Sequence, residues 1–128
     1  MGIIIKELEV ESERTEKLKV LFDTGASSSS LRKDAAEKIG YKREIPEEFK
    51  IVKTTLATGE TIEEKLEGWA KIGIKINGCE IKEIIVPVRK NQLEEMIIGV
   101  DIMQSRKLII DMAKEDINVS KCFTYPIG

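Results

Sequence analysis

One short segment carries the residues best suited to chemistry. The apolar residues 20–22 run directly into Asp23, which is followed by Thr24 and Gly25. A carboxyl group at the edge of an apolar core loses part of its water, and this loss makes acid–base chemistry possible. Asp23 is therefore the first candidate for a functional residue. The same residues also fit a strand that ends in an Asx-type turn with Gly25 at positive φ, and taken alone they favour that simpler interpretation.

A second segment, far downstream, favours the functional interpretation over the simple turn. The apolar residues 96–98 run into Gly99, after which a short helical segment leads to the apolar strand 108–110. Together the two segments resemble the retropepsin-like (clan AA) aspartic proteases, whose active-site loop reads apolar-apolar-Asp-Thr/Ser-Gly-Ala and whose later strand reads apolar-apolar-Gly. The order Gly-Val-Asp-Ile-Met at 99–103 is similar to that of cellular members, such as the protease domains of DNA-damage-inducible proteins. It indicates a prokaryotic or archaeal cellular branch.

The resemblance implies an activity that one chain cannot supply alone. Peptide hydrolysis of the aspartic type needs one ionised carboxyl group, which takes a proton from water, and one protonated group, which polarises the carbonyl. The chain has a single Asp-Thr-Gly. A homodimer would place Asp23 of each subunit on its two-fold axis and so build the pair. The resemblance therefore implies an aspartic endopeptidase that acts as a homodimer on an extended polypeptide.

The resemblance also assigns roles to individual residues. Together with Asp23, Thr24 and Gly25 form the expected catalytic set: Thr24 would hydrogen-bond across the dimer, and Gly25 would leave space and a carbonyl group for the substrate backbone. Eight further residues are expected to bind substrate, as groove floor, as pocket walls or as the tip of a hairpin that folds over the peptide. These are Leu21, Ala26, Ser27, Ala57, Thr58, Gly59, Glu60 and Ile97.

The sequence departs from the viral members of this family in two respects. Viral members often carry an Asp shortly after the Ala and an Arg directly after the later Gly, whereas here these places hold Ser27 and Val100. Both partners of that charge pair are missing together, so no lone charge remains. The expected hairpin over the substrate is also more hydrophilic, with a charged face formed by Glu60, Glu63, Glu64, Lys65 and Glu67.

Periodicity along the chain predicts a mostly β fold, a small closed acid-protease barrel in a single domain over residues 1–128. Alternating or continuous apolar runs bounded by turn residues mark the strands, and Asn77-Gly78 is a strong hairpin signal. The expected strands are 3–10, 18–22, 49–57, 61–66, 69–76, 79–88, 97–98, 107–112 and 117–119. The last two are expected to complete the sheet, and Pro87 to limit the strand before it.

One or two short helices are expected between these strands. The first covers 30–40, where Ser30 can cap the helix and Gly40 can end it. Its apolar face, formed by Leu31, Ala35 and Ile39, is expected to pack behind the Asp23 loop. The second covers 99–104. The tail after Ser120 is expected to contribute to the dimer or to cover the base of the barrel.

Composition excludes several classes of function. The chain of 128 residues has a formal net charge of −2, which gives no general attraction to nucleic acid. It contains no histidine, which excludes Ser-His-Asp and Cys-His nucleophiles and most catalytic zinc sites. No cofactor or metal is expected. Cys79 and Cys122 are far apart and are expected to be two reduced thiols, although a disulfide is compatible with them. No run reaches membrane-spanning length, and a cytoplasmic location is expected.

Two other interpretations remain open. The first is a non-catalytic retropepsin-like module for dimerisation or peptide binding, which the hydrophilic hairpin supports and the intact Asp-Thr-Gly opposes. The second is a small metal- or ligand-binding barrel that uses the Glu-rich strands, for which no ligand spacing is present. A second catalytic carboxylate within the chain is not expected, because capping or turn roles better explain Asp34, Asp101, Asp111 and Asp116.

Overall fold

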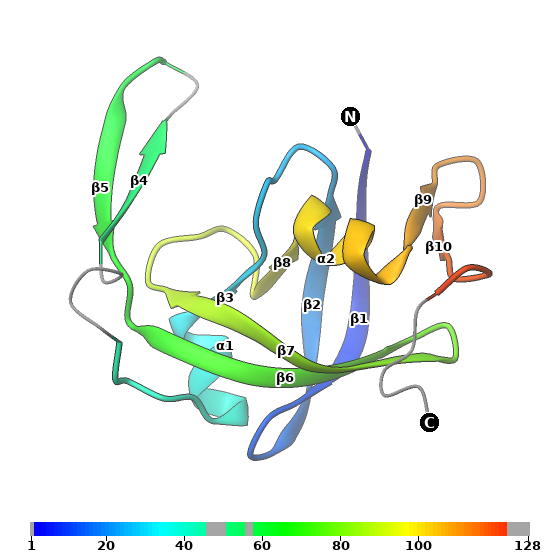
Figure 1. Cartoon of the computed structure of the whole chain (residues 1–128), viewed down its shortest axis with the longest axis horizontal. Coiled ribbons are helices and arrows are strands. Elements are labelled where there is room, and N and C mark those ends of the chain that lie inside the picture. Colours follow the sequence, from blue (N-terminus) through cyan, green and yellow to red (C-terminus); the bar gives the residue numbers. More distant parts are fainter. Residues whose placement is uncertain (1, 46–50, 56–57, 123–128) are drawn as a thin grey trace.

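Six strands close into a barrel in the computed structural model of the chain, which describes residues 2–45, 51–55 and 58–122. The order around the barrel is β1-β2-β8-β3-β7-β6, and pairing of β1 with β6 completes the ring (Figure 1). The barrel strands are β1 (Ile3–Glu11), β2 (Thr15–Asp23), β3 (Ser30–Arg32), β6 (Gly68–Ile76), β7 (Cys79–Arg89) and β8 (Met96–Ile98). The prediction of a mostly β fold with a small closed barrel is confirmed.

Among the described residues, two helices and two hairpins are attached to the barrel. The helices are α1 (Lys33–Ile39) and α2 (Val100–Arg106); the hairpins are β4 (Ile51–Thr55) with β5 (Thr61–Lys65), and β9 (Ile109–Asp111) with β10 (Asp116–Asn118). Figure 1 shows the loop that follows β2 between the β4–β5 hairpin on one flank and α2 with the β9–β10 hairpin on the other. This loop contains the Asp-Thr-Gly segment.

Alternation along β2 explains why the barrel places Asp23 at its rim. Leu18, Val20 and Phe22 are fully buried, whereas Lys19 between them is exposed. Each strand residue turns its side chain to the face opposite that of its neighbour, so these three fill the barrel interior. Asp23 is the last residue of β2 and follows the buried Phe22 directly.

The prediction for the first helix is partly confirmed. Ala35 and Ile39 of α1 are buried, and Gly40 ends the helix with φ of 93°. The cap, however, was predicted wrongly. Ser30 lies in β3, where its hydroxyl donates a hydrogen bond of 2.6 Å to Gln92 Oε1, and the helix begins only after Arg32. A polar residue before an apolar helical pattern does not reveal that a short strand intervenes.

Two expectations about the strands are corrected. Pro87 does not limit β7, which continues to Arg89. β3 pairs with β7 only at Val88 and Arg89, so Pro87 has no strand beside it on that side and its missing N–H is not needed there. The last two strands also do not complete the barrel sheet, since within the part of the chain that the structure describes β9 and β10 pair only with each other.

The cysteines form a disulfide between Cys79 and Cys122, with Cα atoms 6.4 Å apart. The expectation of two reduced thiols was therefore wrong. The bridge joins the start of β7 to the segment after β10, across 43 residues of sequence. Only the fold brings these segments together, and no local pattern shows it. The predicted strand positions Phe49 and Leu56 and the tail beyond Cys122 lie outside the described residues.

Candidate active site

Asp23 is held by hydrogen bonds within its own turn. The Gly25 N–H donates to Asp23 Oδ1 at 2.8 Å, and the Ala26 N–H donates to the Asp23 carbonyl at 3.1 Å. These contacts form the Asx-type turn that was one of the two interpretations of this segment. The turn also fixes the direction of the carboxyl group, which remains half-buried at the barrel rim. The turn and a chemical role are therefore compatible.

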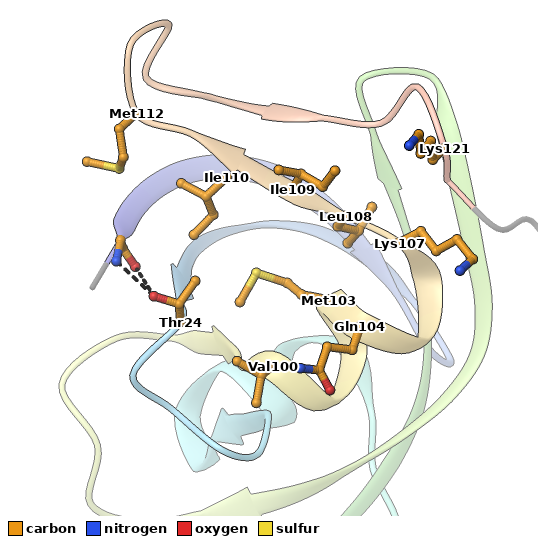
Figure 2. A pocket seen from close by; sticks show the side chains of 11 residues that line it. Thr24, Val100, Met103, Gln104, Lys107, Leu108, Ile109, Ile110, Met112 and Lys121 are labelled. Carbon is orange, nitrogen blue, oxygen red and sulfur yellow. Dashed lines mark hydrogen bonds between the residues drawn. The ribbon is translucent and has the colours of Figure 1, made fainter.

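Thr24 is linked to the beginning of the chain. The Gly2 N–H donates to Thr24 Oγ1 at 2.8 Å, and the Thr24 hydroxyl donates to the Gly2 carbonyl at 3.3 Å (Figure 2). The Thr24 N–H also donates to the Gly2 carbonyl, at 3.1 Å. Ile3 is in turn the β-ladder partner of Asp23. The first residues of the chain thus hold the Asp-Thr-Gly segment in place. The resemblance implies that Thr24 forms a hydrogen bond across a dimer. Because the structure contains one chain, this contact stays a prediction.

A network that sequence reasoning missed fixes the other end of the loop. The Ser29 N–H and hydroxyl both donate to the carboxylate of Asp101, at 3.1 and 2.7 Å. The Ser29 hydroxyl oxygen accepts from the Gly99 N–H at 2.9 Å. A Cβ at Gly99 would lie 2.5 Å from the Ala26 carbonyl oxygen, so only glycine fits there. Asp101 also accepts from its neighbour Ile102, which is the local role predicted for it.

A cavity of about 510 Å³ lies between the loop and the β4–β5 hairpin, and we call it the loop–hairpin cavity. It contains Gly25 and three of the residues predicted to bind substrate, Ala26, Ser27 and Ile97. The other residues that line it are Ser28, Ser30, Lys53, Thr55, Leu66, Pro87 and Arg89. None of these seven was predicted. Lys53 and Thr55 alternate along β4 just before the turn, which is the one signal that could have indicated them.

Of the other residues predicted to bind substrate, those that the structure describes do not line this cavity. Leu21 is half-buried in β2 beside Ile97, its parallel ladder partner in β8. Thr58, Gly59 and Glu60 form the exposed turn of the β4–β5 hairpin, where Gly59 has φ of 91°. Ala57 lies outside the described residues.

A buried ion pair connects the hairpin to the barrel. Glu64 of β5 is only 8% exposed, and its Oε2 accepts from Arg89 Nε at 2.9 Å and from Arg89 Nη2. The backbone N–H of Asn91 approaches Glu64 Oε1 at 3.4 Å. Glu64 was expected on the charged outer face of the hairpin, and that expectation was wrong. The preceding residue of β5, Glu63, points to the opposite face and is exposed.

A second cavity lies on the other side of the loop, and we call it the α2–β9 cavity (Figure 2). Its volume is about 620 Å³. Mostly apolar side chains line it, and Ile109 and Met112 are about half-exposed. Its lining residues are Gly2, Thr24, Val100, Met103, Gln104, Lys107, Leu108, Ile109, Ile110, Met112 and Lys121. An apolar surface therefore adjoins the Asp-Thr-Gly segment.

No metal-binding group is found in the described part of the chain, where three or more His, Cys, Asp or Glu side chains nowhere cluster. None of the helices in residues 2–45, 51–55 and 58–122 is long and apolar enough to cross a membrane.

Comparison with known families agrees with this geometry. Residues 8–105 match the sequence profile of the family described as "gag-polyprotein putative aspartyl protease". This match covers more than half of the chain and includes the Asp-Thr-Gly loop and all of α2 except Arg106. The chain therefore belongs to the retropepsin-like aspartic protease family. No match is found among curated protein sequences.

Solved structures show the same fold. The retroviral protease-like domain of Ddi1 from Leishmania major is 17% identical, with a TM-score of 0.66, 94% of this chain and 90% of that chain covered. EIAV protease complexed with the inhibitor HBY-793 is 25% identical, with a TM-score of 0.51 and coverage of 79% and 86%. A retropepsin-like aspartic protease from Rickettsia conorii is 23% identical, with a TM-score of 0.50 and coverage of 91% and 87%.

Proposed function

We propose that the chain is an aspartic endopeptidase that acts as a homodimer, with Asp23 of each subunit in a shared catalytic pair. The observation that carries this proposal is the setting of Asp23. Its carboxyl group is oriented by the Gly25 N–H, and Gly25 itself lines a cavity that faces a hairpin. Membership of the retropepsin-like family supports the assignment.

In the proposed mechanism the two Asp23 carboxyl groups share one proton, because two adjacent anions repel each other. The ionised group takes a proton from a water molecule, whose oxygen attacks the peptide carbonyl carbon. The protonated group donates to the carbonyl oxygen, which gives a tetrahedral intermediate. Collapse of this intermediate breaks the C–N bond: the carboxyl group that took the proton from water gives it to the departing amine, and the other carboxylate takes back a proton from a hydroxyl of the intermediate, which restores the shared proton.

The β4–β5 hairpin would act as the flap over the substrate. An extended peptide in the loop–hairpin cavity would lie against Ala26, Ser27 and Ile97 on one side and against β4 on the other. Backbone hydrogen bonds of the strand type would supply much of the binding. The expected partners are therefore a second copy of the chain and an extended polypeptide, and the expected location is the cytoplasm.

The α2–β9 cavity supports the dimer. Its mostly apolar lining adjoins Thr24, its exposed residues are Ile109 and Met112, and Met112 lies close to Gly2. Exposed apolar surface of this kind marks an interaction site. A second copy seated here would bring the two Asp-Thr-Gly segments together.

Mixing subunits tests the shared pair directly. We expect Asp23→Asn to lower kcat on unfolded protein by about 10³-fold or more, since the pair acts both as acid and as base. When equal amounts of wild type and Asp23→Asn exchange subunits, a shared pair leaves active only the dimers with two wild-type chains. Activity should then fall to about one quarter of that of the same total amount of wild type.

The control is Asp34→Asn, which changes a surface Asp of α1 and should leave the mixing curve linear in total protein. A fall to one half in the Asp23→Asn mixture would mean that each chain acts alone. Equal cleavage by wild type and Asp23→Asn would refute the catalytic role. Absence of cleavage by both, with peptide binding retained, would favour the non-catalytic peptide-binding module, which the polar exposed turn at Thr58–Glu60 also fits.

A further inference from the structure

The loop–hairpin cavity has an uneven distribution of charge. Of its eleven lining residues, Lys53 and Arg89 are ionisable and both are cationic. No Asp or Glu lines this cavity in the described part of the chain. The cavity wall therefore carries positive charge, although the whole chain has a net charge of −2.

The two cations differ in how their charge is balanced. Arg89 forms the buried ion pair with Glu64, so its charge is largely neutralised within the protein. Lys53 is exposed on β4, and its ladder partner across the hairpin is Glu63. None of the ion pairs found among the described residues includes Lys53. The charge of Lys53 is thus the one that remains available to a bound molecule.

We propose that Lys53 selects substrates with an acidic side chain, so that the cavity takes a Glu or Asp of the bound peptide. This inference rests on the proposed function, because it places a peptide in the same cavity. In a symmetric dimer each subunit contributes one Lys53, so an acidic residue is favoured on both sides of the cleaved bond, at matching distances. In this ion pair Lys53 Nζ would donate a hydrogen bond to the carboxylate of the peptide residue.

The expected preference is modest and depends on salt. An exposed ion pair contributes little, which corresponds to a preference of about two- to fivefold for Glu over the isosteric Gln. The preference should shrink as ionic strength rises, since salt screens exposed charges. The preference should also depend on the sign of the charge at residue 53 rather than on the length of its side chain.

The experiment uses decapeptides that differ only by Glu, Gln or Lys at one position, scanned along the peptide. Their kcat/KM is measured with wild type, Lys53→Glu and Lys65→Glu. Lys65 is the matched control, because it is an exposed lysine of the same hairpin that does not line the cavity. We expect wild type and Lys65→Glu to prefer Glu over Lys at one position on each side of the bond. We expect Lys53→Glu to reverse this order at the same positions.

Binding of the same fluorescein-labelled peptides to Asp23→Asn and to Asp23→Asn/Lys53→Glu, measured by anisotropy, separates this proposal from the proposed function. If cleavage is absent but the Glu peptide binds more tightly and Lys53→Glu reverses the order, the charge selection stands without the protease. If peptides are cleaved with no Glu preference, or if Lys65→Glu has the same effect as Lys53→Glu, the role of Lys53 is refuted while the protease remains. If no peptide is cleaved or bound, both are refuted.

Discussion

At the scale of single residues, the Asp-Thr-Gly loop depends on a hydrogen-bond network from a distant helix. Asp101 accepts from both the N–H and the hydroxyl of Ser29, and Ser29 accepts from Gly99. The Val100 N–H also donates to the Ala26 carbonyl at 2.9 Å. The start of α2 therefore holds the loop that follows Asp23, and we expect Asp101 to position Asp23 through this loop.

Substitution of Asp101 by alanine should separate this role from a merely local one. We expect Asp101→Ala to lower the free energy of unfolding by about 1–3 kcal/mol, because two hydrogen bonds to Ser29 are lost. We also expect kcat to fall more than KM rises, since the orientation of Asp23 is disturbed. The matched control is Asp34→Ala, in the first turn of α1, where the carboxylate likewise accepts from the next N–H. An equal effect of both variants on kcat would contradict the positioning role.

At the scale of elements, the β4–β5 hairpin is attached to the barrel by Glu64 and Arg89. Glu64 is buried, and Arg89 keeps some exposure, with 23% of its side chain accessible. Removing one member of such a pair leaves an uncompensated charge in a dry environment. The hairpin therefore has a charged anchor near its base, while its turn remains exposed.

Glu64→Gln should loosen this hairpin without unfolding the barrel. We expect a local destabilisation of about 2–3 kcal/mol, because the carboxylate that neutralises Arg89 is lost. Hydrogen exchange of the β4 and β5 amides should accelerate accordingly, with β6 and β7 unchanged. Glu63→Gln alters an exposed neighbour on the opposite face and serves as the control. Uniform acceleration across the barrel would instead show that the pair supports the whole fold.

The β9–β10 hairpin is attached by a second charged contact. Lys6 and Asn77 both donate to the Asp116 carboxylate, and the Ile117 N–H adds a third hydrogen bond. These donors, Lys6 first, hold the pKa of Asp116 well below its ordinary value of 3.8. Because the folded pKa is lowered, the contribution is complete above the ordinary pKa and is lost as pH falls toward the folded value.

We therefore expect Asp116→Asn to lower the Tm at pH 6 and to have progressively less effect below about pH 4. Thermal unfolding across this pH range measures the difference between the two proteins. Lys6→Met should reproduce the dependence, since it removes the main donor. A difference in Tm that stays constant from pH 6 to pH 2 would show that the carboxylate charge is not responsible.

At the scale of the whole molecule, the Cys79–Cys122 disulfide joins the barrel to the segment after β10. Disulfides are rare in reducing compartments, except in hyperthermophiles. The bridge therefore fits the expected cytoplasmic location only if the protein comes from such an organism. Cys122 directly follows Lys121, which lines the α2–β9 cavity. The disulfide is therefore adjacent in the chain to the surface proposed for the dimer.

Loss of the disulfide should destabilise the whole chain. We expect Cys79→Ala/Cys122→Ser to lower the free energy of unfolding by about 2–4 kcal/mol and the Tm by about 5–15 °C. Dithiothreitol should shift wild type by a similar amount and leave the double variant unchanged. If reductant has no effect on wild type, and thiol titration finds two free cysteines, the bridge is absent in solution.

Local sequence determined most of the barrel and the candidate for the reactive group. Alternation with a period of two reveals β1, β2, β6 and β7 without any partner, because a strand with one buried face must alternate. The turn at Asn77-Gly78 and the Asp-Thr-Gly segment are equally local, since they depend on adjacent residues. The positions of these four strands, the Asx turn and the retropepsin-like family could therefore be predicted.

Contacts between distant segments were decided by the tertiary structure. Ser29 and Asp101 are separated by 72 residues, Glu64 and Arg89 by 25, and neither pair has a sequence pattern that links its members. The same is true of the disulfide and of Lys53 in the loop–hairpin cavity. A periodic pattern fixes which face of a strand is buried, but only the closed barrel fixes which residues of other strands that face meets.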